Sequence, residues 1–478
     1  MAFGPPVHKS QYSAESIGYA SGTDPYSRDE KRNPFDTPNE TRNPFDTPHR
    51  TPYGSAPASA TGSRITLARS SKAGGYFHSR RVRKGQVDKP WLTRKDPKEK
   101  WITIIPMIGI FVGLALSAYL VYDGLKAVVT HKYCSIYSTD FSEGIDDSYW
   151  TKEAEVGGFS NGQFEQTTIT DENIFMQDGA MVIKPTLQDE SLITQDTVIN
   201  LFDQGICSSD VWSNCITSTN TTNGTIIQPV KSGRINLKKA AIKYGRIEVE
   251  AQLPRGDWLW PAIWLLPVSD AYGAWPTSGE IDILESRGNA HSYAQGGNNI
   301  MSSALHWGPD SANDAWWRTN AKRSALHSTF ADGYHTFGLE WSEKYLFTYL
   351  DNRLAQVMYV PFNPKQGLWQ RGDFPLANGN GTVFVDPWSQ TGQPSTPFDQ
   401  DFYLIINLAV GGQNGWFEDG KSQKPWVDRS PTAKKDFWNA RDEWMKSWDE
   451  GSPELRVRSV KVWQQQGFNG CDNGVLVN

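Results

Sequence analysis

The chain has 478 residues, enough for two or three domains, and its formal net charge at pH 7 is −6. Residues 1–100 contain 18 Lys+Arg and 10 Asp+Glu, which leaves 29 and 43 for the remainder, so a basic tail precedes an acidic body. Because the tail directly precedes an apolar segment, attraction to an anionic lipid leaflet explains its charge better than nucleic-acid binding, and we expect no nucleic-acid partner.

Residues 1–100 are rich in Ser, Pro, Gly, Arg and Thr and lack apolar periodicity, so we expect a disordered tail. Within it, the segment 32–38 (RNPFDTP) recurs as 42–48. The triplets Asn33-Pro34-Phe35 and Asn43-Pro44-Phe45 favour tight turns and resemble the ligand of endocytic EH domains. An EH-domain adaptor is therefore a candidate partner; the alternative is low-complexity repetition without function.

Residues 101–122 contain no charged side chain and have aromatic residues at both ends. This length covers the ~30 Å hydrocarbon layer of a bilayer, so a transmembrane helix is predicted. A cleaved signal peptide would lie at the extreme N-terminus. Basic residues are concentrated upstream of the segment, which by the positive-inside rule predicts a cytosolic N-terminus. The protein would then be a single-pass type II membrane protein with its body in the secretory lumen or outside the cell.

All four cysteines follow the apolar segment, on the side where disulfides persist. Four cysteines allow three pairings. We favour Cys207 with Cys215, which closes a short loop, and Cys134 with Cys471, because the ends of a domain often lie close together. Zinc binding is the weaker alternative, because no Cys-x-x-Cys pair or paired histidine accompanies them. We therefore expect no metal and no cofactor.

Three Asn-x-Ser/Thr sequons lie on the same side of the apolar segment, at Asn220, Asn223 and Asn380, and are predicted glycosylation sites. Asn39 also fits the pattern, but a cytosolic tail would not reach the glycosylation machinery.

The remainder, 123–478, is expected to form one all-β domain. From Asp140 onward, short alternating apolar runs are broken by Gly, Asn and Asp, a pattern typical of an antiparallel β-sandwich.

The stretch 278–286 (SGEIDILES) places three carboxylates among large aliphatic residues. On a regular strand Glu280 and Asp282 share a face, whereas Glu285 has the opposite parity. A β-bulge between Asp282 and Glu285 would bring all three acids to one face and turn the aliphatic residues toward the core.

Three crowded acids repel one another, and burying unpaired charge costs several kcal/mol. Glycoside hydrolysis with retention of anomeric configuration would explain such a cluster. This reaction needs two carboxyl groups about 5 to 5.5 Å apart with separated pKa values. The glutamates could meet across a sugar only on a concave sheet. The alternative is an ordinary amphipathic strand with solvated acids.

The stretches 244–251, 254–267 and 275–280 resemble glycoside hydrolase family 16, in the order found in its laminarinase-like, endo-β-1,3-glucanase branch. The extra residue before Glu285 points to that branch, and the resemblance covers 134–471. It implies a concave, concanavalin A-like jelly roll, with β-1,3-glucan as substrate. It also implies Glu280 as nucleophile, Asp282 as its helper and Glu285 as general acid/base.

Five further residues are expected to bind substrate. Trp275 and Trp307 would stack on sugar rings, and His306 lies in a motif that the family places near the nucleophile. Arg234 and Asn161 belong to other family-like segments; for these two and for His306 the alternative is a structural role. Near Asn161, this chain departs from the family, which has a glutamate at the position of Gln163.

Two other functions remain open. Relatives with this fold serve as non-catalytic β-glucan recognition proteins, although those have typically lost the catalytic acids. Membrane-tethered fungal proteins required for β-1,6-glucan assembly share the order of tail, span and family 16 domain. The sequence does not distinguish hydrolysis from transglycosylation in cell-wall glucan remodelling. It also does not determine the preferred linkage or whether a structural calcium ion binds.

Overall fold

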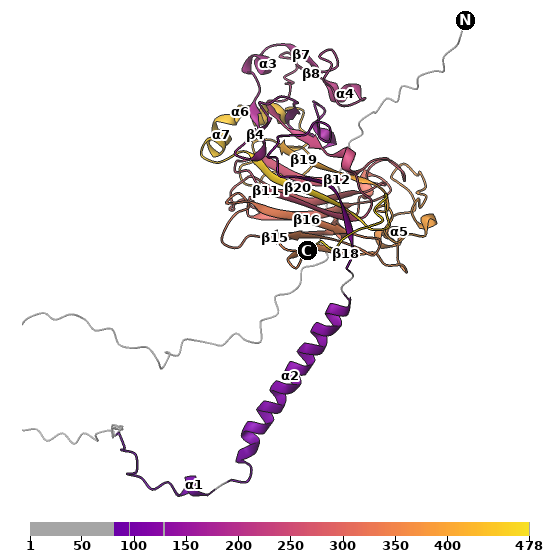
Figure 1. Ribbon diagram of the computed structural model, residues 1–478. Helices are drawn as coiled ribbons and strands as arrows, with labels where there is room; N and C mark the ends of the chain where they lie inside the picture. The colour runs from indigo at the N-terminus through magenta and orange to yellow at the C-terminus, as the bar shows by residue number, and fades with distance from the viewer. Residues whose placement is uncertain (1–80, 95, 128–129, 478) are drawn as a thin grey trace, which may run out of the picture. The chain divides into compact units, whose positions relative to one another are not determined.

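The computed structural model describes residues 81–94, 96–127 and 130–477 (Figure 1). The two Asn-Pro-Phe triplets and Asn39 lie outside these residues, as does most of the basic tail. Within the described part of the tail, a turn and the short helix α1 (Pro90–Thr93) replace part of the predicted disorder.

Helix α2 (Glu99–Ala127) contains the predicted span and extends beyond it at both ends. Its segment Glu99–Gly124 is long and apolar enough to cross a membrane. Pro106 lies inside the helix, a position that membrane-spanning helices tolerate better than soluble ones.

The body is an antiparallel jelly roll built on two large sheets. The first sheet has eight strands, in the spatial order β18-β17-β16-β11-β20-β5-β4, with β1 paired to β20. Its strands are β1 (Tyr133–Thr139), β4 (Ile174–Gln177), β5 (Ala180–Ile183), β11 (Gly245–Gln252), β16 (His335–Trp341), β17 (Tyr345–Leu350), β18 (Gln356–Pro361) and β20 (Leu455–Gln465).

The second sheet has seven strands, in the order β15-β14-β13-β12-β19-β10-β2. Its strands are β2 (Thr151–Lys152), β10 (Arg234–Asn236), β12 (Leu259–Pro267), β13 (Glu280–Ser286), β14 (Ile300–His306), β15 (Asn320–Ser324) and β19 (Phe402–Val410). The strand that carries the three predicted catalytic acids, β13, lies near the middle of this sheet.

Smaller elements surround the two sheets. Two minor sheets contain β3 (Glu165–Thr167), β9 (Val230–Ser232) and β6 (Thr186–Leu187), and β7 (Thr197–Asn200) with β8 (Ile216–Thr219). The α-helices are α3 (Glu190–Thr194), α4 (Trp212–Cys215), α5 (Leu368–Gly372), α6 (Ala433–Asn439) and α7 (Arg441–Asp449). The 3-10 turns are η1 (Gly158–Ser160), η2 (Lys238–Ala240), η3 (Ser311–Asn313), η4 (Trp316–Arg318) and η5 (Ser389–Thr391).

The hydrophobic core lies between the two large sheets. Alternate residues of β11 and β20, such as Val249 and Val460, meet inward-facing residues of β12 and β13, such as Ile263 and Ile281, in one cluster of buried side chains. Because successive residues of a strand point to opposite faces, the other face of each sheet remains free for polar side chains. On the seven-stranded sheet that face carries the acids.

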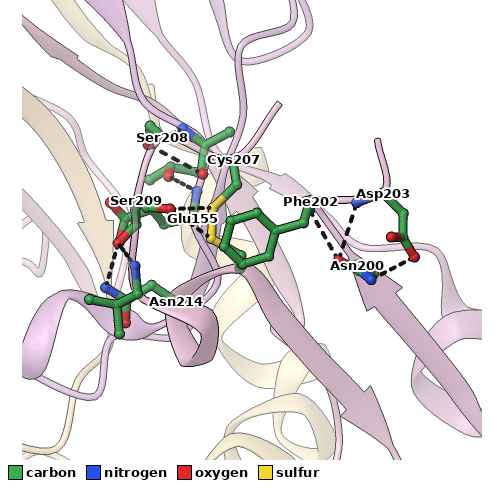
Figure 2. The surroundings of a disulfide bond; sticks show 12 residues. Glu155, Asn200, Phe202, Asp203, Cys207, Ser208, Ser209 and Asn214 are labelled. Carbon is green, nitrogen blue, oxygen red and sulfur yellow. Dashed lines mark hydrogen bonds between the residues drawn. A yellow bond between two sulfur atoms is a disulfide. The ribbon is translucent and has the colours of Figure 1, made fainter. Parts of the chain in front are cut away.

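Both predicted disulfides are present. Cys134 on β1 is bonded to Cys471, which ties the beginning of the body to its end. Cys207 is bonded to Cys215 at the end of α4, and across this short loop Asn214 donates a hydrogen bond to Ser209 (3.1 Å; Figure 2).

We expect the two disulfides to stabilise the body unequally. On the chain-entropy model, a cross-link over 337 residues contributes about 6 kcal/mol and one over 8 residues about 2.5 kcal/mol. A Cys134→Ser/Cys471→Ser double variant should therefore show a larger drop in guanidinium midpoint, followed by tryptophan fluorescence, than Cys207→Ser/Cys215→Ser. Equal drops would show that local packing rather than loop closure determines the effect.

Candidate active site

The three acids share one face because β13 contains the predicted bulge. Against β14, Asp282 pairs with Ala304 and Glu285 with Ser302, so three steps along β13 match two steps along β14. The two residues inside the bulge, Ile283 and Leu284, are both buried in the core. The bulge thus absorbs one residue and brings Glu285 to the face of Glu280 and Asp282.

Glu280 is the first residue of β13 and follows Gly279, whose φ of +85° is a left-handed conformation that favours glycine. The Trp275 indole donates a hydrogen bond to Glu280 Oε2 (2.6 Å). Burial and the neighbouring charge of Asp282 raise the pKa of Glu280 well above its usual value, against the opposing effects of His306 and Trp275. The charge of Asp282 therefore opposes the ionisation of Glu280.

Asp282 begins a chain of polar groups that leads away from Glu280. Its Oδ2 lies 3.2 Å from His306 Nε2, and His306 Nδ1 lies 2.5 Å from Asp314 Oδ2. Burial lowers the pKa of His306, but its hydrogen bonds to Asp282 and Asp314 raise it well above the usual value overall. An imidazolium between two carboxylates compensates part of the negative charge on the strand.

Glu285 accepts a hydrogen bond from the Trp260 indole on β12 (3.0 Å). Burial, followed by the charge of Asp282, raises the pKa of Glu285 to about 7, although His306, Trp260 and Arg287 act in the opposite direction. A carboxyl group with this pKa can both donate and accept a proton near neutral pH, as a general acid/base must. Trp260 is held in turn by Trp416, stacked on it with ring centroids 4.8 Å apart.

The same face continues across β12, β19 and β10. Trp264, opposite Asp282, donates its indole N–H to Asn407 Oδ1 (2.7 Å), and Asn407 pairs in register with Arg234. The Arg234 guanidinium lies over the Trp264 and Phe159 rings, at 4.8 and 4.3 Å from their centroids. Arg234 is thus on the face that carries the acids, but it is buried and ion-paired with Glu153.

Asn161 contacts the loop that follows β19. Its side-chain oxygen accepts a hydrogen bond from Asn414 (3.1 Å), and its carbonyl accepts one from the Gln413 N–H (2.8 Å). This loop also carries Trp416, the partner of Trp260, so three successive contacts connect Asn161 with Glu285. Gln163, near the predicted rim, is buried.

Of the two tryptophans expected to stack on sugar, only one is accessible to a ligand. Trp275 is 44% exposed next to Glu280, whereas Trp307 has no exposed surface. The Trp307 indole donates to Thr319 Oγ1 (2.8 Å) and packs against Trp388. The prediction that Trp307 contacts substrate is wrong, because it follows His306 along the chain and points to the opposite face.

The sequence did not predict two residues that support the site. Trp260 holds Glu285, and Asp314 holds His306. Trp260 lies within a stretch that the sequence analysis singled out, but only the pairing of β12 with β13 reveals that it faces Glu285. Asp314 lies in a loop without any periodic signal.

One cluster of possible metal ligands stands out among the described residues. Glu280, Asp282 and His306 each offer an atom within 4.8 Å of the others. Both nitrogens of His306 already face carboxylates, so a cation bound here would have to displace the contact between His306 and Asp282. An imidazolium of His306 between the carboxylates of Asp282 and Asp314 accounts for the same arrangement without a metal.

The jelly roll and its bulged strand of acids define a class, the β-sandwich of the glycoside hydrolase type. Residues 208–378 match the family model of glycosyl hydrolases family 16. A β-1,3-glucan-binding protein of Penaeus monodon is 38% identical over 348 residues, which cover 70% of this chain and 91% of that protein. The chain therefore belongs to glycosyl hydrolase family 16.

The chain is also similar to two glucanases. Glucan endo-1,3-beta-glucosidase A1 of Niallia circulans is 29% identical over 292 residues, which cover 60% of this chain but only 32% of that protein. Among solved structures, the laminarinase catalytic domain of Thermotoga maritima is 20% identical, and the match covers 70% of this chain and all of that domain, with a TM-score of 0.43.

The surroundings of Glu285 lead to two substitutions with opposite effects. Asp282→Asn removes a neighbouring negative charge and should lower the pKa of Glu285 below about 7. Trp260→Phe removes the indole donor that favours the ionised form, and should raise it. Infrared titration of the carboxyl bands should show both shifts. Absence of a carboxyl group that titrates near pH 7 and disappears in Glu285→Gln would contradict this account.

Proposed function

We propose that the chain is a retaining glycoside hydrolase. The observation that carries the proposal is the bulged strand, which presents Glu280, Asp282 and Glu285 on one face with distinct partners. Retention needs one ionised and one protonated carboxyl group close together. Burial and the charge of Asp282 raise the pKa of both glutamates, to about 7 for Glu285, and the Trp275 indole and His306 act in the opposite direction on Glu280.

The proposed substrate is β-1,3-glucan. The Penaeus monodon relative is named for binding this polymer, and the Niallia circulans relative is named for cleaving it. The exposed aromatic ring of Trp275, beside Glu280, offers a flat apolar surface on which a pyranose ring can lie.

In the first step, the Glu280 carboxylate attacks the anomeric carbon while Glu285 protonates the leaving oxygen, which yields a glycosyl-enzyme and a free sugar hydroxyl. In the second step, Glu285 takes a proton from water, and the oxygen of that water displaces Glu280. An acceptor sugar in place of water would give transglycosylation.

Asp282 is proposed to act on the nucleophile through its charge. Glu280 must be ionised to attack, and the charge of Asp282 opposes that ionisation, whereas the positive charge of His306 favours it. The His306–Asp314 pair fixes the position of Asp282 from the other side. Asp282 and His306 are therefore proposed to tune the nucleophile rather than to bond to the sugar.

The second candidate function is glucan recognition without catalysis. It is favoured by the name of the Penaeus monodon relative, which matches this chain over most of its length. The retention of both glutamates in a polar network favours the enzyme. Incubating the purified protein with laminarin and following product lengths by mass spectrometry separates the two.

The roles of the glutamates can be tested one at a time. Glu280→Gln preserves shape but removes the nucleophilic charge, so activity on laminarin should fall by orders of magnitude while binding survives. Glu285→Ala should abolish cleavage of laminarin but spare the first step on an aryl glucoside whose leaving group needs no proton. Asp282→Asn should give an intermediate loss.

Added azide provides the control. It should restore turnover of the Glu285→Ala variant on the aryl glucoside and yield a β-glycosyl azide, because a small anion can react without a general base. If Glu280→Gln were the rescued variant with a β-azide product, the assignment would be reversed. If wild type binds laminarin and yields no products at all, the recognition function stands instead.

We further propose that the chain is anchored through α2 with its N-terminus in the cytosol. Both disulfides and the exposed Asn220, Asn223 and Asn380 lie on the C-terminal side of α2 and suit a lumenal or extracellular body.

This orientation predicts the pattern of N-glycosylation. Treatment of the full chain from a eukaryotic host with an N-glycosidase should increase its gel mobility, and the combined Asn220→Gln, Asn223→Gln and Asn380→Gln variant should lose the shift. Asn39→Gln should leave the shift unchanged. A shift that depends on Asn39 alone would place the N-terminus in the lumen.

A further inference from the structure

Three aromatic rings lead away from Glu280 along one edge of the seven-stranded sheet. Trp275 contacts Glu280, and its ring centroid lies 5.7 Å from that of His306. The His306 ring is stacked with Trp316, with centroids 6.4 Å apart and an angle of 28° between the planes. Trp316 belongs to η4, in the connection from β14 to β15.

The backbone that carries Trp316 is held at several points. Asp314, which binds His306 through Oδ2, accepts the Trp316 N–H through Oδ1 (3.2 Å). The Asn320 side chain donates to the Trp317 carbonyl (2.9 Å), and Thr319 donates to the Leu305 carbonyl (3.1 Å). The Asp314 carboxylate thus fixes the positions of His306 and Trp316 relative to each other.

Despite this support, the Trp316 side chain is 46% exposed. A large aromatic ring in a braced loop could have been packed inward, as Trp307 is, so its exposure calls for an explanation. Trp317 is similarly exposed, at 59%, but it is covered by the Arg318 guanidinium (4.2 Å) rather than stacked on His306. The two neighbouring tryptophans therefore differ in their relation to the site.

The position of Trp316 relative to the acids is given by the order of strands. Arg234 and Trp264 lie on the β12, β19 and β10 side of β13, whereas Trp316 lies on the β14 and β15 side. Neighbouring strands are about 4.8 Å apart, so a ligand crossing the sheet from Trp264 to Trp316 would span several sugar residues.

We propose that Trp316 forms a sugar-stacking subsite on the β14–β15 side of the acids, which binds a glucan residue remote from the bond that reacts. The inference rests on the proposed function, since it takes β-1,3-glucan as the ligand. Trp316 contributes affinity for longer chains and takes no part in proton transfer.

The test measures binding of laminaribiose and laminarihexaose by calorimetry, with every variant in the Glu280→Gln background so that no turnover occurs. Trp316→Ala should weaken laminarihexaose binding by about 3- to 10-fold, the range expected for one aromatic contact. Laminaribiose binding should not change. Trp316→Phe, which retains an aromatic face, should restore most of the affinity for the hexaose.

Trp317→Ala is the matched control and should bind both ligands as the background protein does. Equal losses from Trp316→Ala and Trp317→Ala, or no loss from Trp316→Ala, would overturn the subsite. A loss shared by both ligands would also overturn it, because it would show that Trp316 acts through His306. Laminarin products from the otherwise wild-type enzyme report on the proposed function separately, and failure of every variant to bind either ligand would reject both.

Discussion

The site depends on a single register shift. The bulge at Ile283 and Leu284 lets β13 bury both aliphatic residues and still present Glu285 beside Asp282. Without the bulge, alternation would turn Glu285 into the core, where an unpaired carboxylate costs several kcal/mol. The bulge therefore serves packing and chemistry together.

The crowding of acids that the bulge creates is balanced by neighbours from other strands. Indole N–H groups of Trp275 and Trp260 contact the two glutamates, and His306 stands between Asp282 and Asp314. These donors favour ionised forms, whereas burial and mutual repulsion favour protonated ones. The raised pKa values of Glu280 and Glu285 indicate that burial and repulsion prevail at both glutamates.

The face that carries the acids is assembled from distant parts of the chain. Asn161 and Asn414 meet across more than half of the body, and Asp314 links β14 to the loop that carries Trp316. The Asp314 carboxylate thus supports both His306, the neighbour of Asp282, and the proposed subsite. Such a shared support couples the position of a recognition residue to the geometry of the reacting groups.

The sequence by itself determined the local features: the apolar helix, the strand of acids with its bulge, and the alternation that marks a β-sandwich. These follow from periodicity and side-chain chemistry within a few residues. The resemblance carried by family-like stretches added the jelly roll and the roles proposed for the acids.

The alternation of side chains along a strand could also have corrected the prediction that Trp307 contacts substrate. With His306 on the face of the acids, Trp307 had to point the other way, into the core. Only the tertiary structure decided which residues from other segments complete the site. The register of β12 brings Trp260 to Glu285, and the fold of a loop without periodicity brings Asp314 and Trp316 to His306. Contacts between segments depend on strand pairing and loop packing, and no local pattern encodes these.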